Sequence, residues 1–128
     1  MRHLPDVNCI YSVKKCEPKE VQSILNEINV SPDQTLSEVL QNLEKLILTN
    51  KKKKIDKNAL DCFEIAIGET ILSYKGAKWK KLSIRSSGLD GYGILLGDDT
   101  VIVPKIMLED LMQVQKIGTL ELYLIGIN

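Results

Sequence analysis

The sequence predicts one α+β domain over residues 1–128, with N-terminal helices packed on a small antiparallel sheet and one helix inserted near the C-terminus. Three observations lead to this fold class. Apolar residues repeat at helical spacing from residue 18 to residue 74, and they alternate in short runs beyond residue 76. The 128 residues are 44% hydrophobic and 27% charged. A chain of this kind can bury one core without a metal or a disulfide.

Two helices are expected in the first 50 residues. Pro18 suits the first position of a helix over 18–28, because it lacks only an N–H that would have no partner there. The second helix covers 35–50, where Thr35 and Glu38 have the spacing of a capping box. Its apolar stripe consists of Leu36, Val39, Leu40, Leu43, Leu46 and Ile47.

A third helix is predicted from Asp56, as its cap, to Gly76. A glycine within this helix, Gly68, costs about 1 kcal/mol relative to alanine, which indicates close packing at that point. The expected inward-facing residues are Leu60, Phe63, Ile67, Ile71 and Tyr74. Phe63 and the lone tryptophan, Trp79, should share one core.

Three strands are expected in "KWKKLSI", "GYGILL" and "TVIVP", with "GDDT" as the hairpin loop between the last two. The stretch "GLDGYG" invites a phosphate-loop interpretation. However, such a loop leads into a helix, and here a strand follows, so a turn is favoured.

The C-terminal region should hold one helix and one strand. Pro104 can open a helix that Gly118 ends. In "TLELYLIGIN" the apolar residues Leu120, Leu122 and Leu124 alternate, which predicts a closing strand.

No metal, cofactor or catalytic site is expected. The three cysteines, Cys9, Cys16 and Cys62, are odd in number and widely spaced, which predicts neither a disulfide framework nor a zinc site. On the third helix, Cys62 is expected to be a small buried apolar residue. Ser12 and Lys15 match a nucleophile motif whose companion motifs are absent. The sequence therefore favours a protein that is not an enzyme.

The expected location is the cytoplasm. Polar and proline residues interrupt the N-terminal segment where a signal peptide would be continuously apolar, and no later run has the length of a membrane span. Neither export nor membrane insertion is predicted.

The charges are unevenly distributed, although the net charge is zero. Residues 1–85 contain 15 basic and 11 acidic residues, whereas residues 86–128 contain 2 and 6. The C-terminal segment thus carries a charge of −4, which would attract a basic partner.

A nucleic-acid-associated or regulatory module is the alternative. The lysine-rich region 51–81 includes "KKKK" and "KWKK", where Trp79 could stack on a base. No RNA-binding or helix-turn-helix signature accompanies these lysines, so a solvated helix end and a charged strand face are favoured over a nucleic-acid site.

Residues 60–124 resemble small uncharacterised bacterial α+β proteins. The likeness rests on "GET" at 68–70, "KGAKW" at 75–79 and "GLDGYGILLGDDTVIVP" at 88–104. Proteins of this type resemble the immunity partners of bacterial toxin systems, such as toxin–antitoxin or contact-dependent inhibition systems. The resemblance implies structural roles for Glu69 and Trp79, with Glu69 pairing Arg85 or a strand lysine, and a protein partner such as a basic toxin domain.

The expected partner-facing surface is acidic. If "GLDGYG" and "GDDT" are turns, their aspartates project outward beside the next helix, with a tyrosine as an aromatic anchor. A surface that is acidic only for solubility is the alternative. The residues of this predicted surface are Asp90, Tyr92, Asp98, Asp99, Glu109 and Asp110.

Overall fold

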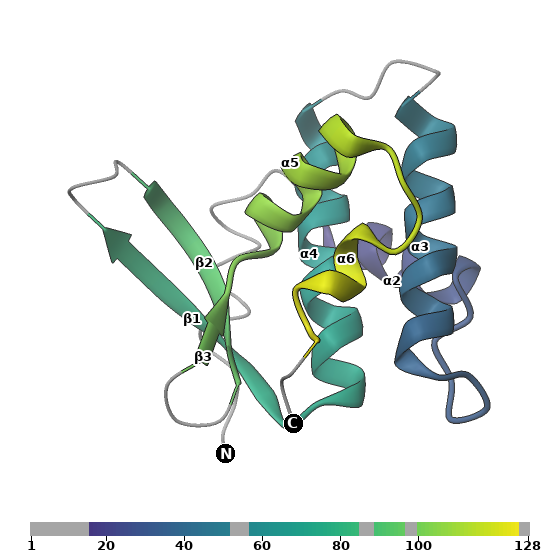
Figure 1. The fold of residues 1–128 in the computed structure, drawn as a ribbon, viewed down its shortest axis with the longest axis horizontal. Helices are drawn as coiled ribbons and strands as arrows, with labels where there is room; N and C mark the ends of the chain where they lie inside the picture. The colour runs from purple at the N-terminus through teal and green to yellow at the C-terminus, as the bar shows by residue number, and fades with distance from the viewer. Residues whose placement is uncertain (1–15, 52–56, 85–88, 97–99, 126–128) are drawn as a thin grey trace.

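The computed structural model describes residues 16–51, 57–84, 89–96 and 100–125. Their order of elements confirms the predicted α+β class, with helices first and a three-stranded antiparallel sheet later (Figure 1). No helix within these ranges is long and apolar enough to cross a membrane. The elements are α2 (Pro18–Glu27), α3 (Leu36–Lys51), α4 (Lys57–Tyr74), β1 (Ala77–Ile84), β2 (Leu89–Leu96), β3 (Thr100–Ile102), α5 (Pro104–Val114) and α6 (Thr119–Leu122).

The predicted helix starts are confirmed at α2, α3 and α5. Pro18 and Pro104 occupy the first turns of α2 and α5. Before α3, the N–H of Thr35 donates to Oε1 of Glu38 (2.9 Å), and the N–H of Glu38 donates to Oγ1 of Thr35 (3.1 Å). The backbone N–H of Thr35 therefore holds the pKa of Glu38 below its usual value. Asp56, the predicted cap of α4, lies outside the described residues.

The sheet has the order β1-β2-β3. Residues 89 to 96 pair with β1 throughout, from Leu89 opposite Ile84 to Leu96 opposite Ala77. The predicted strand "GYGILL" is therefore confirmed, and it begins earlier, at Leu89. The turn predicted at "GLDGYG" is wrong from Leu89 onward, because β1 is long enough to offer each of these residues a backbone partner. Thr100 pairs with Leu96, which confirms that a short connection joins β2 to β3.

One face of the sheet packs against the helices, which form a separate group on one side of it (Figure 1). Trp79 lies opposite Ile94 in the ladder, so Tyr92 and Leu96, two residues to either side of Ile94, share its face. All four of these side chains are buried. Phe63 is buried in the same cluster, as the sequence predicts.

The second half of α4 packs against the start of β1 through Gly68, Glu69 and Trp79. A Cβ atom at Gly68 would overlap the Trp79 ring, so the close packing predicted at this glycine is confirmed. The indole Nε1 of Trp79 donates to Oε2 of Glu69 (3.3 Å). Glu69 thus bonds to the tryptophan, and Arg85, one of its expected partners, lies outside the described residues.

The predicted closing strand is wrong, because residues 119–122 form the short helix α6. Leu120 and Leu124 are buried, whereas Leu122 is 65% exposed. The two buried leucines are four positions apart, which is the spacing of one helix face. The buried carboxylate of Glu44 on α3 accepts the N–H groups of Gly118 and Leu120, both at 2.9 Å. These bonds satisfy N–H groups at the start of α6, which a strand would instead pair with a neighbour.

Helix α5 also ends earlier than predicted. It stops at Val114, and Gln115 adopts a left-handed conformation with φ 59°. Gly118, the predicted end of α5, instead precedes α6 with φ 103°, a backbone conformation that glycine adopts readily. The bonds to Glu44 hold the chain in this conformation.

A disulfide joins Cys16, just before α2, to Cys62 in α4. The two Cα atoms are 5.4 Å apart, and the cysteines are 46 positions apart in sequence. The prediction of cysteines without a disulfide is therefore wrong for this pair, and the third, Cys9, lies outside the described residues. The cytoplasmic location stays a prediction, and disulfides are rare in that compartment.

Candidate partner-binding groove

An open groove of about 420 Å³ lies between α4 and α5. Each helix contributes residues three or four positions apart, so one stripe of each faces the groove. The apolar lining comes from Leu60, Leu108 and Met112. The polar lining consists of Lys57, Asp61, Glu64, Lys105, Glu109 and Gln113.

Three of the residues that line the groove are carboxylates. Asp61 and Glu64 are buried, which is uncommon for acidic side chains, while Glu109 is exposed at the rim. The Nζ of Lys57 lies 3.7 Å from Oδ1 of Asp61, one helical turn away, and the lysine side chain itself is 79% exposed. An apolar floor with carboxylates beside it can bind a cationic side chain along its whole length, because the aliphatic part of lysine or arginine also needs contact.

Some predicted binding residues lie at this groove and others do not. Glu109 lines it, but the neighbouring Asp110 accepts a hydrogen bond from the Tyr123 hydroxyl (3.1 Å). Partial burial raises the pKa of Tyr123, and its bond to Asp110 raises that pKa further. Asp110 is thus engaged within the fold, joining α5 to the segment after α6.

The structure places the predicted acidic-surface residues of the sheet region differently from one another. Tyr92 is only 2% exposed, so its assignment as an exposed aromatic anchor is wrong. It falls on the inner face because it alternates in phase with Ile94. Asp90 lies within β2, opposite Ser83. Asp98 and Asp99 lie outside the described residues.

Sequence reasoning missed Lys57, Asp61 and Glu64. The available signal was the placement of two carboxylates, Asp61 and Glu64, among the buried residues of an otherwise apolar helix. Acids at such positions need a polar surrounding, because burial of an isolated charge is unfavourable. Their spacing from Lys57, at i+4 and i+7, also placed all three on one side of the helix.

The structure removes the aromatic residue on which the alternative prediction of a nucleic-acid module depends. Trp79 is 2% exposed and packs on Gly68, so it offers no free ring for stacking on a base. Lys51 donates from Nζ to the backbone carbonyl of Met112 (3.0 Å) and so connects α3 to α5. Lys78 and Lys80 are exposed on β1.

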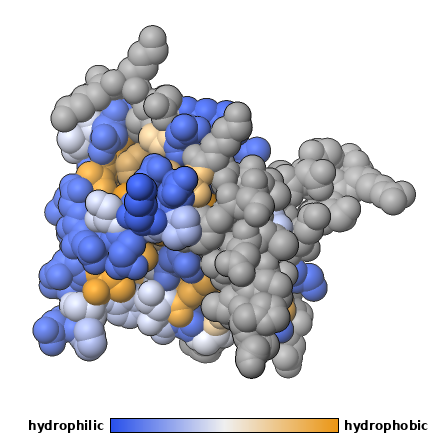
Figure 2. All heavy atoms as spheres, turned by 180° about the vertical axis from the view of Figure 1, so that it is seen from behind, coloured by the Kyte–Doolittle hydropathy of each residue, from blue (hydrophilic) through white to orange (hydrophobic). Residues whose placement is uncertain are grey.

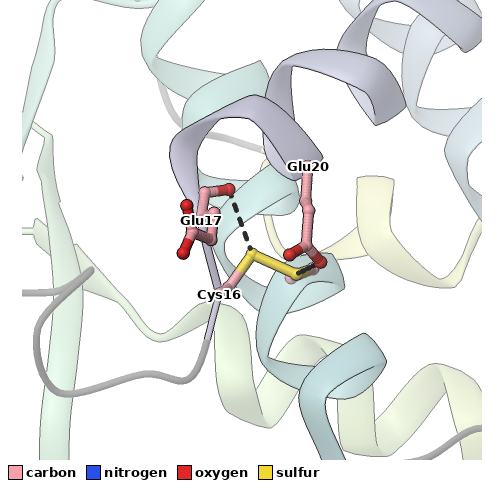
Figure 3. The surroundings of a disulfide bond; sticks show 4 residues. Cys16, Glu17 and Glu20 are labelled. Carbon is pink, nitrogen blue, oxygen red and sulfur yellow. Dashed lines mark hydrogen bonds between the residues drawn. A yellow bond between two sulfur atoms is a disulfide. The ribbon is translucent and has the colours of Figure 1, made fainter.

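A second hollow, of about 250 Å³, lies between α2 and α4 beside the disulfide. The Sγ of Cys62 is 3.3 Å from Oε2 of Glu20, and the Sγ of Cys16 is 3.6 Å from the carbonyl of Glu17 (Figure 3). Figure 2 shows the side on which α2 lies, where the described surface is mostly hydrophilic with separate hydrophobic patches. The hollow is lined by residues of both helices, namely Glu20, Ser23, Ile24, Glu27, Ala59, Cys62 and Phe63.

A scan of protein-family models, a search of curated proteins and a search of solved structures found no match to this chain. The resemblance of residues 60–124 to small bacterial α+β proteins, and the likeness of such proteins to immunity proteins, stay predictions.

Proposed function

We propose that this protein is a non-enzymatic binding protein, most concretely an immunity protein that neutralises a bacterial toxin domain by direct binding. The groove between α4 and α5 is the observation that carries the proposal. It combines an apolar floor with three carboxylates, the combination that suits a basic side chain of a protein partner.

The chemistry of the groove selects a cationic segment. Leu60 and Leu108 contact the aliphatic part of an inserted lysine or arginine, and Met112 adapts its flexible side chain to the shape of the ligand. Glu109 attracts the charge from the rim, and Asp61 and Glu64 complement it deeper in the groove. The −4 charge of residues 86–128 adds long-range attraction for a basic domain.

Two lysines at the same groove restrict which partner fits. Lys105 is exposed on α5, and Lys57 is exposed at the start of α4. Both would repel a uniformly basic surface, so the partner needs acidic residues beside its inserted basic side chain. This pattern of alternating charge favours one partner over others.

The proposal is tested by producing the protein together with the product of the gene adjacent to its own. A stable complex should form, and inhibition of that product's toxic activity should follow from binding. Glu109→Lys should slow association about tenfold, and more strongly at low salt. Asp33→Lys, an exposed acid between α2 and α3, is the matched control and should leave association close to that of the parent.

Equal association rates for the Glu109→Lys and Asp33→Lys variants would remove the groove from the binding surface. Failure of the adjacent gene's product to form a complex would contradict the immunity assignment itself.

A further inference from the structure

We propose that reduction of the Cys16–Cys62 disulfide converts it into a binding site for Zn²⁺, with Cys16, Cys62 and Glu20 as the protein ligands. The three ligand atoms all lie within 4.8 Å of one another. They come from two elements, since Cys16 and Glu20 flank the start of α2 and Cys62 belongs to α4. The site therefore forms only when α2 is packed on α4.

The donor set suits zinc rather than calcium or magnesium. Two thiolates are soft ligands, and a carboxylate oxygen completes common zinc sites at about 2.0–2.2 Å. Two thiolates that each hold zinc at about 2.3 Å in tetrahedral geometry lie roughly 3.8 Å apart. With Cα atoms 5.4 Å apart, Cys16 and Cys62 can reach this separation by side-chain rotation.

The positions of the ligands leave one coordination site accessible. Cys16 and Cys62 are buried, whereas Glu20 is exposed and lines the hollow between α2 and α4 together with Cys62. A water molecule can reach the metal from this hollow as the fourth ligand. Three protein ligands with one open position are typical of zinc sites that exchange a ligand.

The oxidised and reduced forms exclude one another chemically. In the disulfide neither sulfur is a thiolate, so neither can hold the metal. A dithiol reductant transfers two electrons and two protons to the disulfide, giving two cysteine thiols, and is itself oxidised to a disulfide. Zinc binding then releases the two thiol protons to solvent. In the dithiol form without metal, the Cys62 thiol can donate to the Glu20 carboxylate, 3.3 Å away.

The contact between α2 and α4 is thus covalent under oxidising conditions and metal-bridged under reducing ones. This inference is independent of the partner-binding groove, which lies on the α5 side of α4. It revises the expectation from the sequence that the cysteines bind no metal.

The inference is tested with the full chain carrying Cys9→Ser, which removes the third cysteine. The protein is reduced with excess dithiol, freed of it without oxygen, and titrated with Co²⁺ as a spectroscopic substitute for zinc. We expect one equivalent of tetrahedral cobalt with thiolate charge-transfer absorption, displaced by Zn²⁺. The oxidised protein should show no such absorption. Bound zinc should raise the melting temperature of the reduced protein.

Two variants and one matched control test the assignment of the ligands. Cys62→Ser should abolish the charge-transfer band or reduce it to that of one thiolate, and Glu20→Gln should weaken metal binding at least about tenfold. Glu27→Gln is the matched control, because Glu27 lines the same hollow without belonging to the three-ligand cluster, and it should keep the parent affinity.

Four results would contradict the inference. A reduced, folded protein without the thiolate–cobalt band would exclude the site, and an unchanged band in Cys62→Ser would place the metal elsewhere. A reduced chain that is unfolded and stays unfolded with excess zinc would also contradict it, because binding at this site would favour the fold. Equal affinities of Glu20→Gln and Glu27→Gln would exclude Glu20 as a ligand.

Discussion

The first half of helix α4, residues 57–64, buries polar and reactive groups, whereas the second half, residues 65–74, buries mainly apolar ones. Asp61 and Glu64 line the groove toward α5, and Cys62 joins α2 through the disulfide. In the second half, Gly68 lets the Trp79 ring approach the helix. The second half is thus mainly an apolar packing surface, whereas the first half combines the disulfide with the carboxylates on which the proposed binding groove depends.

Removal of the tryptophan should have the largest effect on stability. Trp79→Ala leaves a cavity against Gly68 and should lower the free energy of unfolding by about 3–5 kcal/mol. Denaturant unfolding measures this loss. Lys80→Ala, an exposed neighbour on β1, should change it by less than about 0.5 kcal/mol. A loss below about 1 kcal/mol for Trp79→Ala would show that the second half of α4 is not the main structural contact.

Reduction of the disulfide should have the next largest effect. Closing a loop between cysteines 46 positions apart stabilises the fold by about 4 kcal/mol when chain entropy alone is considered. Unfolding of the Cys9→Ser protein, compared with and without a dithiol in metal-free buffer, measures the contribution. Equal stability in the two states would mean that Cys16 and Cys62 do not form the bond in solution.

A methyl group at Gly68 should disturb the packing without removing any contact. Gly68→Ala should lower stability by about 1–3 kcal/mol, because the added Cβ overlaps the Trp79 ring. Alanine is intrinsically more favourable in a helix than glycine by about 1 kcal/mol. A net loss of stability would therefore show that the overlap with the Trp79 ring outweighs this preference. Ser73→Ala, exposed on the same helix, is the control and should not be strongly destabilised. A Gly68→Ala protein more stable than the parent would refute the close contact.

The smallest effect is a change in pH dependence at Glu69. Burial raises the pKa of this carboxyl, and the hydrogen bond from Trp79 only partly opposes the shift. The folded protein therefore binds this proton more tightly than the unfolded chain does. Stability from this group is present below the unfolded pKa, near 4.5, and is lost as pH rises through the higher folded value.

Glu69→Gln removes the titrating group and keeps an oxygen that can accept from Trp79. Melting temperatures measured from pH 4 upward should fall less steeply with pH in this variant than in the parent. Identical pH profiles would show that Glu69 does not carry the shift. Glu17→Gln, exposed before α2, provides the control.

Features that depend on neighbours in sequence could be predicted from the sequence. The capping box of α3 and the proline starts of α2 and α5 need only residues within one turn. The packing at Gly68 was predictable because a glycine within a helix is unfavourable unless something needs the space.

Features set by distant residues could not be predicted in this way. Glu44 bonds to N–H groups 74 and 76 positions later and thereby favours a helix where alternating leucines predict a strand. The Cys16–Cys62 bond and the groove likewise depend on how helices pack. Tyr92 is a different case. Its two-residue spacing from Ile94 predicts that both side chains lie on the same face of a strand, whereas a turn at "GLDGYG" would expose it.

Hydrogen exchange of the protein with and without its adjacent-gene partner tests most directly the claim that the first half of α4 binds a ligand. We predict slower exchange in the complex for backbone amides of residues 57–64 and 105–113, with amides of residues 65–74 and of β1 unchanged. Slower exchange confined to other segments, or none in these two, would contradict the assignment of the groove as the binding surface.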